Sequence, residues 1–260
     1  MKERQFMTRP RILSLVFFVI LSLILIGDAA VFSFIQAVDA WTMLLGAVAM
    51  LMALLSSMVL FLLPFEEGFS RAGGSLAVVA SVTLVAFALP SFGNSYVDAA
   101  ILCLIVLVVV TVHQDQFYDP RKGAVPREIV LPIVLLLPVF LAIVESAVLG
   151  GGIWSEFHQA PPLYFIPFAA LFGYLEEAVF RGGVQREIGA LAGPNRALVC
   201  GAALDAGFMA FWGSYPLVVF TFVLALLMGF IYKKWGSVTL VGVTRAIEAS
   251  WLMIILAMLA

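Results

Sequence analysis

The sequence has few charged residues, cysteines and histidines. Only 12% of its 260 residues are charged, whereas an ordinary soluble domain carries about 25%. This scarcity excludes a water-soluble fold. No basic patch is present that could meet phosphates, so nucleic acid is not an expected partner. Cys103 and Cys200 both lie in apolar runs without a second cysteine at metal-ligand spacing, and each is interpreted as core packing.

Apolar residues make up 63% of the chain and fall into long runs. Runs of this length predict an all-α polytopic membrane bundle of about nine transmembrane helices. The first run could also be a signal peptide, but it continues past Asp28 to Ile35, which favours an uncleaved span. The predicted spans are 12–36, 40–64, 75–91, 95–113, 128–150, 161–181, 196–213, 216–232 and 237–259.

The positive charges predict an orientation. If the N-terminus is cytoplasmic, thirteen of the fourteen Lys and Arg residues fall on the cytoplasmic side, as the positive-inside rule requires. The exception, Arg245, lies inside the last predicted span. This distribution predicts an integral membrane protein with a cytoplasmic N-terminus. It suits a prokaryotic plasma membrane, although a protein of the endoplasmic reticulum would show the same pattern.

The chain divides into residues 1–127, with about four spans, and residues 128–260, with about five. Charged side chains inside spans are costly, usually pair or line a wet cavity, and mark candidate functional sites. Most of them lie in the second part. They are Asp28, Glu145, Glu176, Glu177, Arg181, Asp205, Arg245 and Glu248.

Spacing predicts how some of these charges pair. Glu177 and Arg181 are four residues apart and face each other on a helix, whereas Glu176 projects about 100° away without a local partner. Glu176 could therefore act as a base, or it could bond a neighbouring helix and fix packing. Arg245 and Glu248 are three apart and form a second predicted pair.

Other polar residues give weaker signals. Asp205 lies among small residues that permit close helix approach, and it could pair with Arg181 or Arg245 across the bundle. Glu145 stands alone on its span. His113 and His158 fall on opposite sides of the predicted membrane and cannot share a metal site.

The run Leu175–Gln185 contains Glu-Glu-x-x-x-Arg followed by Gly. It resembles the first motif of the CPBP group of integral-membrane proteases, which includes the type II CAAX prenyl proteases and the Abi proteins. Later features in the family's order extend the resemblance over about residues 161–259. They are Gly193-Pro194, Phe208–Trp212, Gly229 and Gly236-Ser237.

The resemblance implies roles for the first motif: Glu176 as general base, Glu177 as its companion and Arg181 as ion-pair partner. The two family histidines are absent, because Trp212 and Arg245 stand at their positions. Neither side chain can shuttle a proton near neutral pH. Zinc is possible by resemblance, but the ligand histidines are missing, so no cofactor is predicted.

Three functions remain open. The favoured one is a catalytically impaired family member that binds a hydrophobic helix or a lipidated tail as a scaffold or regulator, with a cavity lined by Phe208, Trp212 and Glu248. The alternative is an active glutamate-type intramembrane endopeptidase in which Arg245 holds the oxyanion and Asp205 assists Glu176. A transporter-like subunit is the third. The expected partners are the lipid bilayer and a transmembrane helix or lipidated peptide of another protein.

Overall fold

The computed structural model describes residues 16, 19–27, 40–62, 67–88, 126–149, 165–209 and 215–259. Throughout these ranges the chain is helical apart from Pro126, Gly193, Gly236 and Ser237, and no strand is present, which confirms the all-α prediction. Within them, three helices are long and apolar enough to cross a membrane, namely Glu128–Val148, Tyr215–Trp235 and Val238–Met258. The predicted number of about nine spans remains a prediction, and the spans at 12–36 and 95–113 lie largely or wholly outside the described residues.

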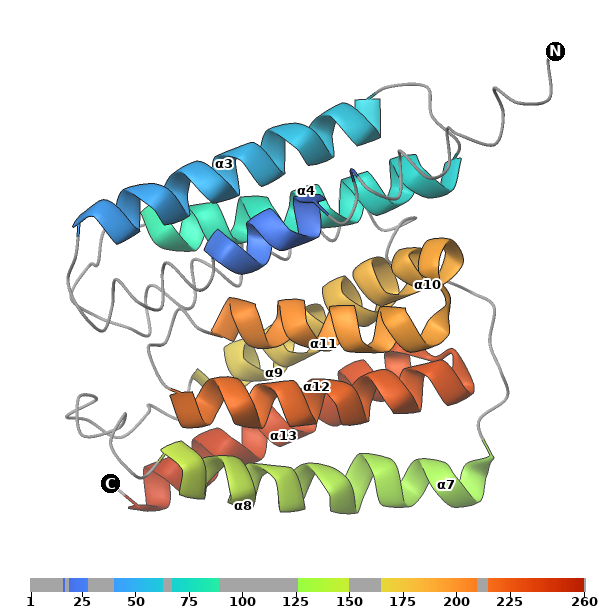
Figure 1. Cartoon of the computed structure of the whole chain (residues 1–260). Helices are drawn as coiled ribbons and strands as arrows, with labels where there is room; N and C mark the ends of the chain where they lie inside the picture. The colour runs from blue at the N-terminus through green and yellow to red at the C-terminus, as the bar shows by residue number, and fades with distance from the viewer. Residues whose placement is uncertain are drawn as a thin grey trace, which may run out of the picture.

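The N-terminal helices form one side of the bundle. They are a helical segment at 19–27, α3 (Ala40–Leu62) and α4 (Glu67–Ala88), and they lie together at the top of Figure 1. Their apolar side chains share one hydrophobic core with helices from the C-terminal half. Helix α4 begins at Glu67 and not at residue 75 as predicted, so Arg71 lies in the helix and not in a loop.

Two prolines shape the helix at the opposite side of the bundle. It comprises α7 (Arg127–Leu131), the wide turn η1 (Pro132–Leu136) and α8 (Leu137–Leu149). Pro138 lacks an N–H and its ring would clash with the preceding turn of a regular α-helix. In the wide turn the Leu137 N–H instead donates to the Pro132 carbonyl, five residues back. The predicted span at 128–150 therefore exists as one helix with a π-type irregularity.

The motif helix is longer than predicted. Helix α9 (Ile166–Glu177) continues through the wide helix η3 (Ala178–Gln185) into α10 (Arg186–Ala192). The prediction that this span ends at Arg181 is wrong, because Arg181 is fully buried and its charge is paired inside the bundle. The helix ends at Gly193, whose φ of 90° suits glycine alone, and Pro194 then starts α11 (Pro194–Met209).

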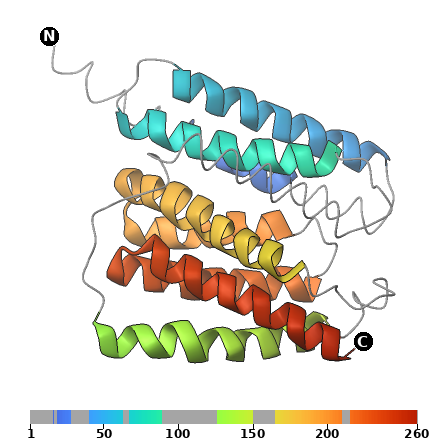
Figure 2. The ribbon, with the colours of Figure 1, turned by 180° about the vertical axis from the view of Figure 1, so that it is seen from behind.

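The last two helices form a hairpin. Helix α12 (Tyr215–Trp235) ends at Gly236, which has a φ of 64°. Ser237 then caps α13 (Val238–Leu259), since its Oγ accepts the Leu240 N–H at 3.1 Å. In Figures 1 and 2 the helices lie in layers, with the N-terminal helices at one side, α9–α11 next, then α12 and α13, and α7–α8 at the other side.

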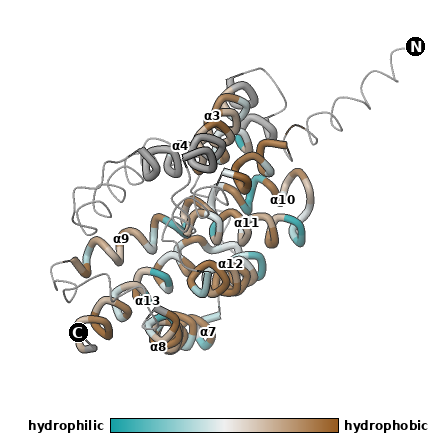
Figure 3. The backbone as a smooth tube through the Cα atoms, turned by 60° about the vertical axis from the view of Figure 1, so that its left-hand side comes forward, coloured by the Kyte–Doolittle hydropathy of each residue, from teal (hydrophilic) through white to brown (hydrophobic). Residues whose placement is uncertain are grey.

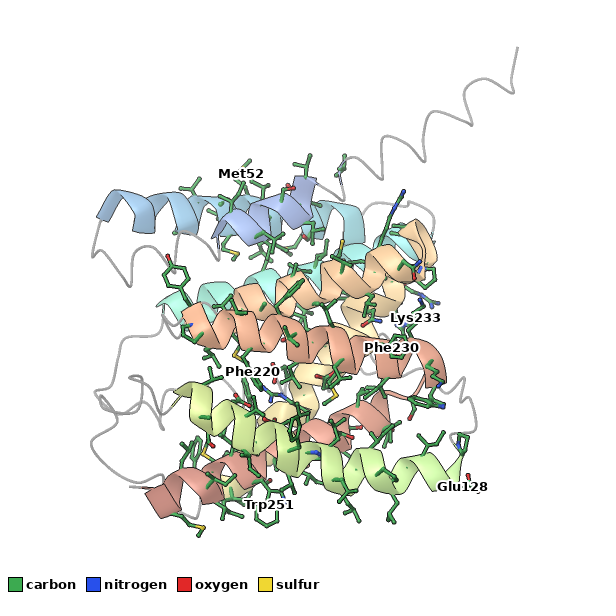
Figure 4. The ribbon with its side chains drawn as sticks, turned by 60° about the horizontal axis from the view of Figure 1, so that its bottom comes forward. Met52, Glu128, Phe220, Phe230, Lys233 and Trp251 are labelled. Carbon is green, nitrogen blue, oxygen red and sulfur yellow. The ribbon has the colours of Figure 1, made fainter. Side chains whose placement is uncertain are left out.

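The outward surface of the bundle is apolar. Leu136, Val219 and Phe140 are 70%, 63% and 62% exposed, and Phe230 and Trp251 also lie on the surface in Figure 4. In Figure 3 hydrophobic colour runs along most of the C-terminal helices. Water-soluble monomers rarely expose continuous apolar faces of this kind. The surface is that of an integral membrane protein.

Charged residues gather at one end of the bundle. Lys233 and Glu128 lie at the same end in Figure 4, and Lys233 Nζ donates to Asn195 Oδ1 at 2.6 Å. Arg196 lies in the first turn of α11, next to Asn195. Charge segregated in this way is what a membrane-spanning bundle requires. That this end is cytoplasmic remains a prediction.

Helices α9 and α13 approach each other closely because glycine stands at both contacts. A Cβ at Gly173 would lie 2.9 Å from the carbonyl oxygen of Arg245, and a Cβ at Gly242 would lie 2.8 Å from the ring of Tyr174. Small residues at such contacts allow membrane helices to pack tightly. Gly173 lies one helical turn before Glu176 on α9, so this contact holds the Arg245 backbone close to Glu176.

We predict that Gly173→Ala lowers the stability of the bundle by about 1–3 kcal/mol, because the added methyl group pushes against backbone atoms. Thermal unfolding in detergent micelles measures the effect. Gly189→Ala is the matched control, since its Cβ would meet only the Ala197 Cβ at an ordinary 3.7 Å. The control should be neutral or stabilising by up to about 1 kcal/mol. Equal stability of the two variants would contradict the close approach.

Candidate functional site

Seven charged side chains are buried together in the C-terminal half. Each is between 0% and 6% exposed, and they come from α8, α9, η3, α11 and α13. Ion pairs and hydrogen bonds arrange them around two guanidinium groups. We call this set the charged network: Glu145, Glu176, Glu177, Arg181, Asp205, Arg245 and Glu248.

Arg181 is the centre of the first group. Its Nε donates to Glu177 Oε2 at 3.0 Å, and its Nη2 donates to Asp205 Oδ2 at 2.5 Å. The predicted pairing of Glu177 with Arg181 is confirmed, and of the two partners considered for Asp205 the structure selects Arg181. The first of these contacts passes from α9 into the wide helix η3, all of whose residues are buried. Wide π-type turns of this kind are frequent at functional sites.

Arg245 is the centre of the second group and contacts three carboxylates. Its Nε donates to Glu176 Oε2 at 3.2 Å, and its Nη1 donates to Glu145 Oε2 at 3.2 Å and to Glu248 Oε2. The predicted pair with Glu248 is therefore confirmed. Glu176 has a partner on another helix, and Glu145, which the sequence left alone, belongs to the same group.

The two groups meet at adjacent residues of α9. Glu177 pairs with Arg181, and Glu176, the residue before it, pairs with Arg245. The Arg181 group and the Arg245 group are therefore neighbours in one network. Three of the four helices that supply it, α8, α9 and α13, also pack directly against one another as the pairs α8–α13 and α9–α13.

The residues predicted to line a binding cavity lie in different surroundings. Phe208 belongs to the hydrophobic core shared with the N-terminal helices, with its ring centroid 6.4 Å from Phe172 and 6.1 Å from Phe180. Glu248 belongs to the charged network. Trp212 lies outside the described residues. A common cavity lined by all three remains a prediction.

Gln185 is a buried polar residue that the sequence interpretation missed. Its Nε2 donates to the Gly229 carbonyl of α12 at 2.9 Å. A Cβ at residue 229 would lie 2.7 Å from Gln185 Oε1, so a side chain there would push against the Gln185 amide. The family order already singled out Gly229. Gln185 lies four residues after Arg181, on the same face of the helix, and this spacing is the signal that could have identified it.

The donor atoms of the network do not suit a zinc ion. Among the described residues, no group of three or more His, Cys, Asp or Glu side chains is placed to hold a metal. The carboxylates that approach one another do so around Arg181 and Arg245, whose positive charges would repel a cation. His113 and His158 lie outside the described residues.

Comparison with known proteins identifies one family. Residues 158–251 match the family model described as Rce1-like, type II CAAX prenyl endopeptidase Rce1-like. This segment includes every member of the charged network except Glu145. No match was found among curated proteins or among solved structures.

We predict that Arg245→Met destabilises the bundle by about 3–5 kcal/mol, because removing one partner leaves buried carboxylates without their counter-charge. The midpoint of thermal unfolding in detergent measures the loss. Lys233→Met is the control: it also removes a positive charge, but from an exposed side chain bonded to Asn195. It should cost less than about 1 kcal/mol. A similar loss in both variants would show that Arg245 is not the centre of a buried network.

Proposed function

We propose that the chain, whose residues 158–251 match the Rce1-like family model, is a CAAX-protease-like membrane protein that binds without cleaving. Its ligand is a hydrophobic helix or a lipid-modified tail of another protein. The bound segment is held for scaffolding or regulation. Arg245, which contacts three carboxylates at once, is the observation that carries the proposal.

The surroundings of Glu176 support a loss of hydrolysis. A general base must accept a proton from a water molecule within hydrogen-bonding reach. Glu176 Oε2 already accepts the Arg245 Nε–H at 3.2 Å, and the Glu176 side chain is buried. Arg245 stands where the family resemblance places a histidine, and a guanidinium cannot take up or release a proton in a protein.

The alternative, an active endopeptidase with Arg245 as oxyanion donor, has less support. An oxyanion donor must point at the position where negative charge develops. Arg245 Nε and Nη1 point instead at Glu176, Glu145 and Glu248. Either of these two nitrogens could stabilise an oxyanion only after releasing a carboxylate that is buried with it, which is costly in a membrane interior.

The binding half of the proposal is supported by the family and by the apolar surface. The matching family is named for an endopeptidase of prenylated CAAX tails, and such a tail brings both a hydrophobic chain and a peptide. The outward faces of α8 and α12 are lined by exposed apolar side chains that a lipid chain can contact. We therefore choose a prenylated peptide as the probe.

In reconstituted vesicles we expect no cleavage of a prenylated CAAX peptide by the native chain, and no difference when Glu176 is changed to Gln. Mass spectrometry of the recovered peptide detects cleavage. An active type II CAAX prenyl endopeptidase in the same vesicles is the positive control. Cleavage by the native chain that is lost in Glu176→Gln would overturn the non-cleaving proposal in favour of the glutamate-type endopeptidase.

We also expect a photoreactive prenylated peptide to crosslink to the reconstituted chain more strongly than the same peptide without its prenyl group. The labelled segment, mapped by mass spectrometry, should fall within residues 158–251. Competition by unlabelled prenylated peptide should reduce the labelling, because one site is being filled. Labelling that is independent of the prenyl group, or that spreads over the whole chain, would contradict a specific site.

A further inference from the structure

Three exposed, positively charged residues gather where helix α12 ends and helix α11 begins. Lys233 Nζ donates to Asn195 Oδ1 at 2.6 Å, and this bond joins the last turn of α12 to the first turn of α11. Lys234 follows Lys233 in the chain and Arg196 follows Asn195, so both lie beside the bond. We call Arg196, Lys233 and Lys234 the cationic cluster.

No carboxylate neutralises the cationic cluster. In the part of the chain that the structure describes, none of its three members forms an ion pair with an Asp or Glu. The acid nearest to Arg196 in sequence, Glu187 on α10, is paired with Arg186. Glu128 lies at the same end of the bundle in Figure 4 but belongs to α7. The cluster therefore presents positive charge at the surface, and such charge attracts an anion.

Two contacts hold the lysines of the cluster in place. Lys233 is bonded to Asn195, and Lys234 Nζ lies 4.7 Å from the centroid of the Trp235 ring, a distance at which the ring attracts a cation. Trp235 itself packs against a buried apolar cluster. The positive-inside rule requires positive charge in this connection but neither of these contacts. The ammonium groups are therefore positioned before a ligand arrives, which lowers the entropic cost of binding.

An apolar stripe leads along α12 to the cationic cluster. Val219, Val223 and Phe230 are each more than half exposed and recur at helical spacing. Lys234 comes four residues after Phe230 and so continues the same face. In Figure 4 Phe230 and Lys233 lie next to each other at the end of α12. The surface of this helix thus combines a hydrophobic stripe with positive charge at one end.

We propose that this surface is a binding site for an anionic phospholipid of the surrounding bilayer. The cationic cluster binds the phosphate, and the acyl chains lie along the apolar stripe of α12. A lipid fits because it joins an anion to a long apolar chain, as the surface requires. A zwitterionic headgroup fits less well, since it carries an ammonium group that the cluster repels. The site is separate from the charged network and does not rest on the proposed function.

Native mass spectrometry of the full chain in an uncharged detergent tests the proposal. The chain is titrated with phosphatidylglycerol and, separately, with phosphatidylcholine of the same acyl chains. We expect phosphatidylglycerol to bind about tenfold more tightly or better, with an affinity that falls as the salt concentration rises. Soluble glycerol phosphate should bind about tenfold more weakly than phosphatidylglycerol or worse, because it lacks the acyl chains that contact α12.

Substitutions in the cluster should weaken the binding of phosphatidylglycerol alone. Lys234→Gln should lower this affinity about fivefold, and the double variant Arg196→Gln and Lys234→Gln about thirtyfold, because each removes one positive charge beside the phosphate. Binding of phosphatidylcholine should not change. Lys233 is left in place, because its bond to Asn195 also joins two helices.

Two controls separate the site from general effects of charge. Lys234→Arg keeps the positive charge and should keep the affinity. Arg71→Gln is the matched control, since it removes one positive charge from an exposed residue on α4, and it should change the affinity by less than about twofold. The thermal unfolding midpoints of all variants in lipid-free detergent should match that of the native chain, because the substituted residues are exposed.

Equal affinities for phosphatidylglycerol and phosphatidylcholine would overturn the proposal, as would an unchanged affinity in the double variant. An equal loss in Arg71→Gln would also overturn it, because binding would then follow net charge and not the cationic cluster. Glycerol phosphate that binds as tightly as phosphatidylglycerol would show a phosphate site and not a lipid site. The assay contains no peptide, so failure of the lipid site and failure of the proposed function are distinguishable.

Discussion

The arrangement of the C-terminal helices depends on one constraint, which is that charge buried in an apolar bundle must be neutralised by other buried groups. Arg181 and Arg245 meet this constraint with carboxylates from helices α8, α9, α11 and α13. Since removing any partner leaves a charge without water or counter-charge, the helices must keep their relative positions. The glycines between α9 and α13 bring the backbones close enough for Arg245 to reach Glu176.

Much of the fold could be predicted from the sequence, because an apolar run of about twenty residues predicts a membrane-spanning helix. The spans at 40–64, 128–150 and 237–259 agree with α3, α7–α8 and α13 to within a few residues. The predicted end at Arg181 failed for a physical reason. A buried, paired arginine looks in sequence like a loop charge, and the wide helix η3 carries Gly182 and Gly183 without breaking.

The candidate site could be predicted only where its contacts are local. Spacing identified the pairs of Glu177 with Arg181 and of Arg245 with Glu248, because residues three or four apart meet on a helix. The contacts of Arg245 with Glu176 and Glu145 join residues far apart in the chain, and no periodicity reports on them. The motif and its family match brought Glu176 to attention, whereas Glu145 could be found only in three dimensions.

The central claim is that Arg245 holds Glu176 as an ion pair inside the bundle and so removes it from hydrolysis. A double-mutant cycle of Arg245→Met and Glu176→Gln, followed by thermal unfolding in detergent, tests this contact most directly. The account predicts a coupling free energy of about 0.5–3 kcal/mol, with Glu176→Gln partly restoring the stability lost in Arg245→Met. Strictly additive losses would contradict it, because they would mean that the two side chains do not interact.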